Sequence, residues 1–191
     1  MKIGITGGIG SGKSYVAQLL RQRDICVYDC DSAAKRLMNN SPELKAKLKT
    51  LIGSQAYDLN GRLNKAEVAQ FLLASETNRK TIDNIVHPAV FSDFKQSGMT
   101  WIESAILFES GLDRLVDRIV LVSAPDDIRI SRIMLRDGIS REKACDWIGQ
   151  QWPTEELRKR SHFEIVNDGK SDLNSQIDDI IRQTGSRPCQ A

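Results

Sequence analysis

Short apolar runs alternate along this chain with longer segments in which apolar positions recur every three or four residues. The short runs predict five β-strands, at residues 2–6, 25–28, 100–107, 118–122 and 163–166. The longer segments predict helices at residues 14–23, 32–38 and 173–182, and an almost continuous helical region from 42 to 94. Strands that alternate with helices in this way are typical of an α/β fold with a parallel sheet.

The same pattern divides the chain into parts. The long helical region is more than one crossover connection needs, so we expect residues 31–97 to form a helical insert. Residues 125–160 are helical and rich in arginine, and we expect them to form a second helical part. The core would then consist of residues 1–30, 98–124 and 161–184, followed by a flexible tail at 185–191.

Composition mainly excludes some classes of protein. The 191 residues are 40% hydrophobic and 27% charged, as in ordinary soluble globular proteins. A net charge of +2 is too small to argue for nucleic acid or an anionic membrane, and we expect neither as a partner. The N-terminus lacks the apolar region of a signal peptide, and no apolar run approaches the length of a membrane span.

The cysteines indicate the compartment in which the protein works. The chain has four of them, Cys26, Cys30, Cys145 and Cys189. None forms a CxxC pair, which argues against a zinc site and against a disulfide framework. We therefore expect reduced thiols and a cytoplasmic location.

The stretch GITGGIGSGKS, residues 4–14, carries the strongest chemical signal. Gly7, Gly12, Lys13 and Ser14 fit the P-loop pattern in full, between a predicted strand and a predicted helix. In such a loop, backbone N–H groups converge on phosphate oxygens, the lysine reaches the β- and γ-phosphates, and the serine hydroxyl binds Mg²⁺. The alternative is a glycine-rich turn without a ligand. We expect ATP to contact Gly8, Ile9, Gly10, Ser11, Gly12, Lys13, Ser14 and Tyr15.

A P-loop alone does not define the reaction. The loop after the last predicted strand reads Asn167-Asp168-Gly169 rather than a guanine-binding NKxD, and no DxxG follows a central strand. These features favour a small-molecule kinase over a GTPase. The alternatives are a nucleoside or nucleoside-monophosphate kinase and a nucleotide-dependent binding or regulatory protein in which the P-loop works as a switch.

Two carboxylates end the second predicted strand, in Tyr28-Asp29-Cys30-Asp31. If the extended geometry persists, Asp29 and Asp31 lie on the same side, at the sheet edge where ligands of α/β proteins bind. A carboxylate there can accept the proton of an attacking hydroxyl. The alternative is that one of the two caps the following helix.

Several short motifs follow one another along the chain. They are GITGGIGSGKS, YDCDSAAKRL, His87-Pro88, ILFE at 106–109, Arg132, Arg136-Asp137-Gly138 and Asn167-Asp168-Gly169. In this order and spacing they resemble the dephospho-CoA kinase family over nearly the whole chain. The departures from the family pattern are Tyr15, Cys30, Ala105 and the pair Ser161-His162. None of them replaces a group with an obvious chemical role.

The resemblance implies an activity and a fold. The activity is ATP-dependent phosphorylation of the ribose 3′-hydroxyl of dephospho-CoA, the last step of coenzyme A biosynthesis, with Mg²⁺ as cofactor. The fold is a P-loop NTPase-type three-layer α/β sandwich, in which the insert is a CoA-binding domain and residues 125–160 are a lid.

The resemblance also implies roles for single residues on the acceptor side. Asp31 would act as the base or orient the hydroxyl, and Asp29 would support the site. The residues implied to bind the acceptor besides these two are Thr6, His87, Glu109 and Arg132. By residue type alone, His87 before a proline could instead mark a helix end, and Glu109 could be a charge in the first turn of a helix.

On the nucleotide side, the resemblance implies catalytic roles for Lys13 and Arg136. Arg129, Arg132 and Arg136 share one helical face, for which a solvated surface is the ordinary explanation. We expect Arg136 to close over the phosphates with Arg132 as its support, and Arg129 to lie at the surface. The residues implied to lie near the adenine are Asn167 and Gly169, whose alternative role is an ordinary turn. Gln151 matches a glutamine of the family, without a role that the sequence reveals.

Overall fold

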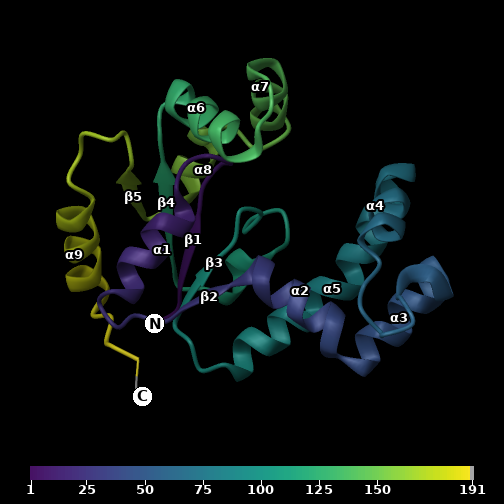
Figure 1. Ribbon diagram of the computed structural model, residues 1–191. Helices are drawn as coiled ribbons and strands as arrows, with labels where there is room; N and C mark the ends of the chain where they lie inside the picture. Colours follow the sequence, from purple (N-terminus) through teal and green to yellow (C-terminus); the bar gives the residue numbers. More distant parts are fainter. Residues whose placement is uncertain (190–191) are drawn as a thin grey trace. The chain divides into compact units, whose positions relative to one another are not determined.

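The computed structural model describes residues 1–189 of the chain (Figure 1). It contains two compact units. The first joins Met1–Tyr28 to the residues from Met99 onward, and the second is Asp29–Gly98. Within residues 1–189, no helix combines the length and the apolar character needed to cross a membrane.

The first unit is built on a five-stranded sheet with the order β2-β3-β1-β4-β5. The strands are β1 (Ile3–Thr6), β2 (Val27–Asp29), β3 (Trp101–Glu103), β4 (Arg118–Ser123) and β5 (Phe163–Val166). β1 pairs in parallel with β3 and with β4, and β4 pairs in parallel with β5. The predicted α/β fold with a parallel sheet is confirmed.

Helices follow these strands along the chain, and all but the last of them lie between two strands. They are α1 (Lys13–Arg21), α6 (Asp126–Asp137), α7 (Arg141–Gly149), α8 (Thr154–Arg160) and α9 (Leu173–Thr184), with a short 3₁₀ turn at Leu112–Leu115. α1 contacts α9, and α9 contacts β5, whereas α8 packs on β4 (Figure 1). Val120 and Val122 of β4 join the core under α1 and α9. Leu121 between them is fully buried on the opposite face, as expected for a strand covered on both sides.

The apolar run at residues 100–107 is a strand only as far as Glu103. The register explains why it stops. Ile5 is opposite Glu103, and β1 ends one residue later, where the chain enters the glycine-rich loop. Residues beyond Ser104, whose N–H still donates to the Ile5 carbonyl, have no β1 partner to extend the ladder. Leu107 is buried, but in a turn.

The second unit is helical. Its helices are α2 (Cys30–Asn40), α3 (Pro42–Ile52), α4 (Lys65–Ala74) and α5 (Glu76–Gln96), with a 3₁₀ turn at Ser54–Ala56. Ser41 and Ser75 cap α3 and α5 by accepting backbone N–H bonds, at Leu44 and Asn78. Pro88 lies inside α5, so the proposed helix end at His87 is wrong. The contacts of α5 with α2, α3 and α4 hold the helix together through the proline.

A disulfide joins Cys26 to Cys189, which corrects the expectation of four reduced thiols. Within residues 1–189, Cys30 and Cys145 take part in no disulfide. The segment before Cys189 is also held, because Trp101 Nε1 donates to Ser186 Oγ and the Cys189 N–H donates to the Asp24 carbonyl. The flexible tail that we expect from 185 onward stays a prediction. For 190–191, that prediction lies outside the described residues. No sequence pattern indicates this disulfide, because 163 positions separate the two cysteines.

A cross-link that closes so long a loop should stabilise the fold by restricting the unfolded chain. We expect Cys189→Ser to lower the free energy of unfolding by about 2–4 kcal/mol in the absence of reductant. The measurement is chemical denaturation with and without reductant. In reductant the variant and the wild type should unfold alike. Cys145→Ser, at an exposed free cysteine, is the matched control and should leave both curves unchanged. Wild-type protein with the same stability in both conditions would contradict the prediction.

Candidate active site

The glycine-rich loop leaves β1 and enters α1 at Gly12, whose φ of 96° lies in the left-handed region. A side chain at Gly12 would also collide with the amide of Asn167, so only glycine fits. Lys13 begins α1 and is 8% exposed. Its Nζ donates to the carbonyls of Gly7, at 2.8 Å, and Gly8, at 3.2 Å, which holds the ammonium group inside the curve of the loop.

The outer side of this loop is held by side chains from distant parts of the first unit. Asn167 Nδ2 donates to the Ser11 carbonyl at 2.8 Å, and Arg132 Nη1 donates to the carbonyls of Gly10 and Ser11, both at 3.3 Å. Arg132 Nη2 in turn donates to the backbone and side-chain oxygens of Asn167, both at 3.1 Å. The Ser11 carbonyl and the Gly12 N–H belong to the same trans peptide and point in opposite directions. Because the carbonyl is held on the outer side of the loop, the Gly12 N–H faces the inner side. An inward-facing amide at a helix N-terminus is suited to bind an anion.

Asn167 therefore lies against the glycine-rich loop, which sequence reasoning did not predict. It is 5% exposed and braces the loop, whereas we expected it beside the adenine. Gly169 lies in the turn that follows, with φ of 77°. Asp168 stabilises this turn by accepting the N–H groups of Ser171 and Lys170, which lowers the pKa of its carboxyl group.

The three arginines of α6 differ in environment. Arg129 is 4% exposed and donates from Nε to the Ile9 carbonyl at 3.0 Å, so the prediction that it lies at the surface is wrong. The physical reason is that the first half of α6 packs against the loop, where Gly10 approaches the Arg129 backbone. Arg132 reaches the same loop. Arg136 is further along the helix, with 59% of its side chain exposed.

Arg136 is engaged by its neighbour. It donates to both carboxylate oxygens of Asp137, the shortest distance being 2.7 Å. These hydrogen bonds raise the pKa of Arg136 and lower the pKa of Asp137. A guanidinium on an exposed helix end is available to a ligand once it exchanges this partner, so the lid role of Arg136 stays a prediction.

Glu103 is a candidate that sequence reasoning missed. It closes β3 beside β1, and its Oε1 accepts a hydrogen bond from Ser14 Oγ at 3.4 Å. Its position at the carboxyl end of the strand next to the loop could have revealed it, but the predicted strand ran past it toward Glu109. Glu109 lies exposed, six residues beyond the end of β3. A hydroxyl and a carboxylate at one place are the oxygen ligands that Mg²⁺ takes beside a P-loop.

Two buried hydroxyl groups also point to a ligand at this loop. Thr6 Oγ1 and Ser11 Oγ have no hydrogen-bond partner among residues 1–189. Both residues are almost fully buried, at 0% and 1% exposure. A buried hydroxyl without a partner is costly, and an oxygen-rich group bound in the loop would supply one.

The aspartate pair and His87 belong to the second unit. The strand ends at Asp29, and α2 begins at Cys30, so the extended geometry does not persist and the alternation argument for the pair is wrong. Asp29 caps α2 by accepting the N–H of Ser32 at 3.0 Å and its hydroxyl at 2.8 Å. Asp31 lies exposed in the first turn of α2.

His87 lies half-buried on α5. It stacks on Phe91, with ring centroids 6.0 Å apart, and its Nε2 lies 3.6 Å from an oxygen of Asp83. In the first unit, Tyr15 lies in the first turn of α1 with 52% of its surface exposed.

Comparison with known proteins decides between the kinase classes. A family model described as dephospho-CoA kinase matches residues 1–172, which include all of the second unit and the first unit up to the start of α9. The chain belongs to the dephospho-CoA kinase family. Members of this family catalyse the ATP-dependent last step of coenzyme A biosynthesis. The prediction of a small-molecule kinase, and the resemblance that named its family, are confirmed.

Individual proteins are also similar to this chain. A dephospho-CoA kinase of Bacteroides fragilis is 39% identical over 188 residues, which cover 95% of this chain and 91% of the relative. A solved structure from Thermus thermophilus is 31% identical, with a TM-score of 0.84 and 98% of each chain covered. A dephospho-CoA kinase structure from Campylobacter jejuni, 20% identical with a TM-score of 0.68, shares the fold; it covers 96% of this chain and 98% of its own.

Proposed function

We propose that this chain transfers the γ-phosphoryl group of ATP to the ribose 3′-hydroxyl of dephospho-CoA. The observation that carries the proposal is the phosphate loop between β1 and α1, braced from outside by Arg132 and Asn167. The bracing directs a backbone amide inward, where it can bind phosphate without reorganising. Family membership supports the choice of acceptor.

On the nucleotide side, residues 8–15 would surround the phosphates and bind them through those backbone N–H groups that face the inner side of the loop. Lys13 would place its charge on the β- and γ-phosphates. Ser14 Oγ and the carboxylate of Glu103 are the groups that fit Mg²⁺. When bound there, Mg²⁺ would offset the negative charge of the transferring phosphoryl group. The lid, residues 125–160, would bring Arg136 to the same charge and exclude water.

On the acceptor side, Asp31 would accept the proton of the 3′-hydroxyl as it attacks. Asp29 is committed to the cap of α2 by two hydrogen bonds, which favours Asp31 as the base. Thr6, His87 and Glu109 would line the acceptor.

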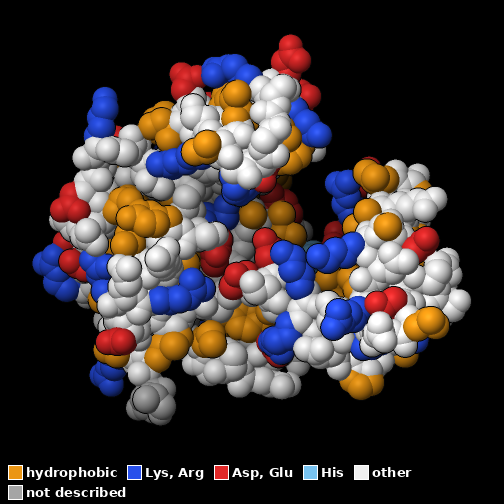
Figure 2. Space-filling model, in the orientation of Figure 1, with side chains coloured by type: hydrophobic (Ala, Val, Ile, Leu, Met, Phe, Trp, Pro, Cys, Tyr) orange, Lys and Arg blue, Asp and Glu red, His pale blue; other side chains and the backbone are white. Residues whose placement is uncertain are grey.

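The charge on the second unit fits a substrate that carries a diphosphate. Figure 2 shows several Lys and Arg side chains on the face that includes α2. Lys35 and Arg36 of α2 are both exposed. Positive charge on this helical insert is suited to attract the diphosphate of dephospho-CoA.

The test is acceptor specificity. ADP release from ATP is measured with dephospho-CoA and, as controls, with a panel of nucleosides and nucleoside monophosphates. We expect dephospho-CoA to be the one acceptor in this panel that supports turnover of ATP. The product should match authentic coenzyme A by mass and chromatography. Turnover with a nucleoside and none with dephospho-CoA would overturn the proposal.

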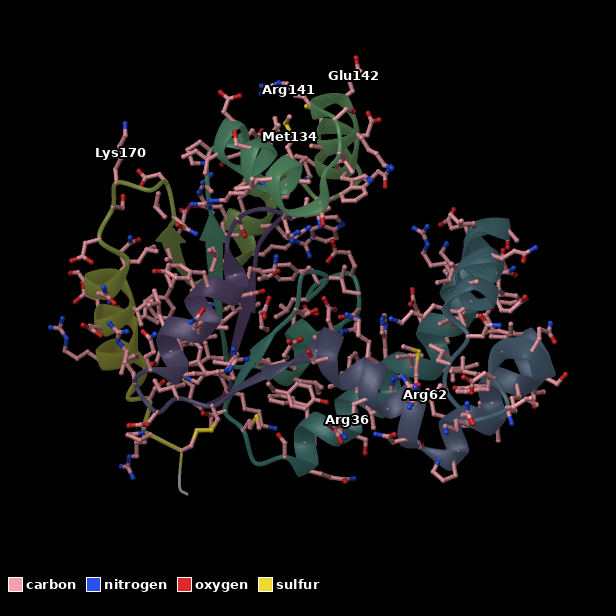
Figure 3. The ribbon with its side chains drawn as sticks, in the orientation of Figure 1. Arg36, Arg62, Met134, Arg141, Glu142 and Lys170 are labelled. Atoms are coloured by element: carbon pink, nitrogen blue, oxygen red, sulfur yellow. A yellow bond between two sulfur atoms is a disulfide. The ribbon has the colours of Figure 1, made fainter. Side chains whose placement is uncertain are left out.

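Glu103 gives a separate prediction about the metal. We expect Glu103→Gln to raise the Mg²⁺ concentration needed for half-maximal activity by about 10–100-fold, because a neutral amide is a weaker partner for the metal and for Ser14. The measurement is a Mg²⁺ titration at saturating ATP and acceptor. Glu142→Gln on α7, where the side chain points outward (Figure 3), is the matched control. An unchanged titration for Glu103→Gln would remove this residue from the metal site.

A further inference from the structure

Ile9, in the middle of the phosphate loop, is held on both of its peptide groups by side chains from far along the chain. Its N–H donates to Oε1 of Gln151 at 2.6 Å, and its carbonyl accepts from Nε of Arg129 at 3.0 Å. Gln151 lies between α7 and α8, and Arg129 lies in α6. Two separate segments of the first unit therefore meet at one residue of the loop.

The bond from Gln151 fixes the peptide between Gly8 and Ile9. The N–H and C=O of a trans peptide point in opposite directions, so the Gly8 carbonyl faces away from Gln151. That carbonyl accepts from Lys13 Nζ at 3.2 Å and from the Ser11 N–H at 3.2 Å. By holding one side of this peptide, Gln151 fixes on the other side an acceptor for the lysine.

The bond from Arg129 fixes the next peptide in the same way. With the Ile9 carbonyl directed to Arg129, the N–H of Gly10 is turned to the inner side of the loop. Arg129 is itself held, because its Nη1 donates to Asp126 at 2.9 Å and lies 3.5 Å from Thr154 Oγ1. A side chain at Gly8 would collide with Nη2 of Arg129, so the contact also limits what the loop can carry.

The backbone of Gln151 is fixed too, since its N–H donates to the Ile148 carbonyl at 3.1 Å. Gln151 and Arg129 border a cavity of about 650 Å³ that also reaches Trp152 and Val166. This space matters for experiment, because it leaves room for a different side chain at position 151 without overpacking.

We infer that Gln151 and Arg129 are positioning residues that set two peptides of the phosphate loop before ATP binds. Neither is required to touch the reacting atoms; each acts through Ile9 on groups that do, Gln151 on the anchor of Lys13 and Arg129 on the Gly10 amide. Such preorganisation increases affinity by removing a cost that binding would otherwise incur. This inference rests on the proposed function because it takes ATP as the ligand of the loop. Its test measures ATP binding and does not require dephospho-CoA to be the acceptor.

The test compares three substitutions. Gln151→Met is similar in length and removes the acceptor, Gln151→Glu keeps an acceptor oxygen, and Gln150→Met makes the same change at the exposed neighbour. The measurements are the Kd of a non-hydrolysable ATP analogue with Mg²⁺, the KM for ATP and for dephospho-CoA, and the melting temperature.

We expect Gln151→Met to raise the Kd of the analogue and the KM for ATP by about tenfold or more. The KM for dephospho-CoA and the melting temperature should stay close to the wild type. Gln151→Glu should remain within about threefold of the wild type in ATP affinity, and Gln150→Met should be indistinguishable from it. A purely structural role would lower the melting temperature and affect both substrates.

The outcomes separate the inference from the proposed function. Wild-type ATP affinity in folded Gln151→Met would overturn the inference, and so would an equal loss in Gln151→Met and Gln151→Glu. If Gln151→Met does not fold, Gln151→Asn, which keeps the amide but loses its reach, takes its place with the same expectation. Wild-type protein that binds the analogue but leaves dephospho-CoA unphosphorylated would refute the proposed function. The Kd values of the analogue for the three variants would still decide the role of Gln151.

Discussion

An Asp31→Asn variant is expected to bind ATP like the wild type and to lose most of its turnover, with kcat lower by about 10²–10⁴-fold. The physical reason is that asparagine has nearly the shape of aspartate but cannot take up the proton of the acceptor hydroxyl. Asp31 is exposed in the first turn of α2, so the change leaves the core untouched. The measurements are kcat with dephospho-CoA and the Kd of an ATP analogue.

Asp29→Asn makes the same substitution two residues earlier and serves as the matched comparison. Asparagine is as good a helix cap as aspartate, so the bonds to Ser32 should persist and the loss of kcat should be much smaller. If Asp29→Asn were the inactive variant and Asp31→Asn the active one, the two roles would be exchanged. If both variants turned over normally, neither carboxylate would be the base.

Much of the fold could be predicted from the sequence because of how a parallel sheet is buried. β1 and β4 are buried along nearly their whole length and therefore read as short, mostly apolar runs. The predicted bounds of β5, residues 163–166, match the structure. The glycine-rich loop could also be predicted from the sequence. The spacing of its residues is local, and so is its context, with a strand before it and a helix after it.

The errors arose where a neighbour in space decides the outcome. The apolar run at residues 100–107 stops being a strand at Glu103 because its partner β1 ends, which no window of sequence around residue 103 reveals. By residue type Pro88 indicates a helix end, yet α5 continues through it because three other helices pack on α5. The disulfide of Cys26 with Cys189 depends on the return of the chain after α9.

The candidate site divides in the same way. The residues of the loop itself follow from a motif, but the side chains that hold its shape do not. Arg129, Gln151 and Asn167 lie 120 to 156 positions away from the carbonyl or amide that each one binds. The spacing of the arginines in α6 showed that they share a face, but it could not show that half of this face is covered by the loop.

The second large effect is expected at Lys13. We predict that Lys13→Ala lowers kcat/KM by about 10³-fold or more and also weakens ATP binding, in contrast to Asp31→Asn. Nζ of Lys13 is held by the carbonyls of Gly7 and Gly8, on the inner side of the loop. Its removal takes away a positive charge from the phosphates and a shared donor from two backbone carbonyls. Both losses reduce the binding of ATP and the stabilisation of the transferring group.

Lys170→Ala is the control for the charge alone, because this lysine extends into solvent from the turn after β5 (Figure 3). It should retain wild-type kinetics, although both variants reduce the net charge by one. Lys13→Arg should not restore activity, since a planar guanidinium does not fit a site that leaves only 8% of Lys13 exposed. The measurements are kcat, KM for ATP and the melting temperature. If folded Lys13→Ala protein bound ATP as tightly as the wild type, the phosphates would lie elsewhere. An ammonium group held at the loop carbonyls would attract a triphosphate bound in the loop, so its loss would weaken binding.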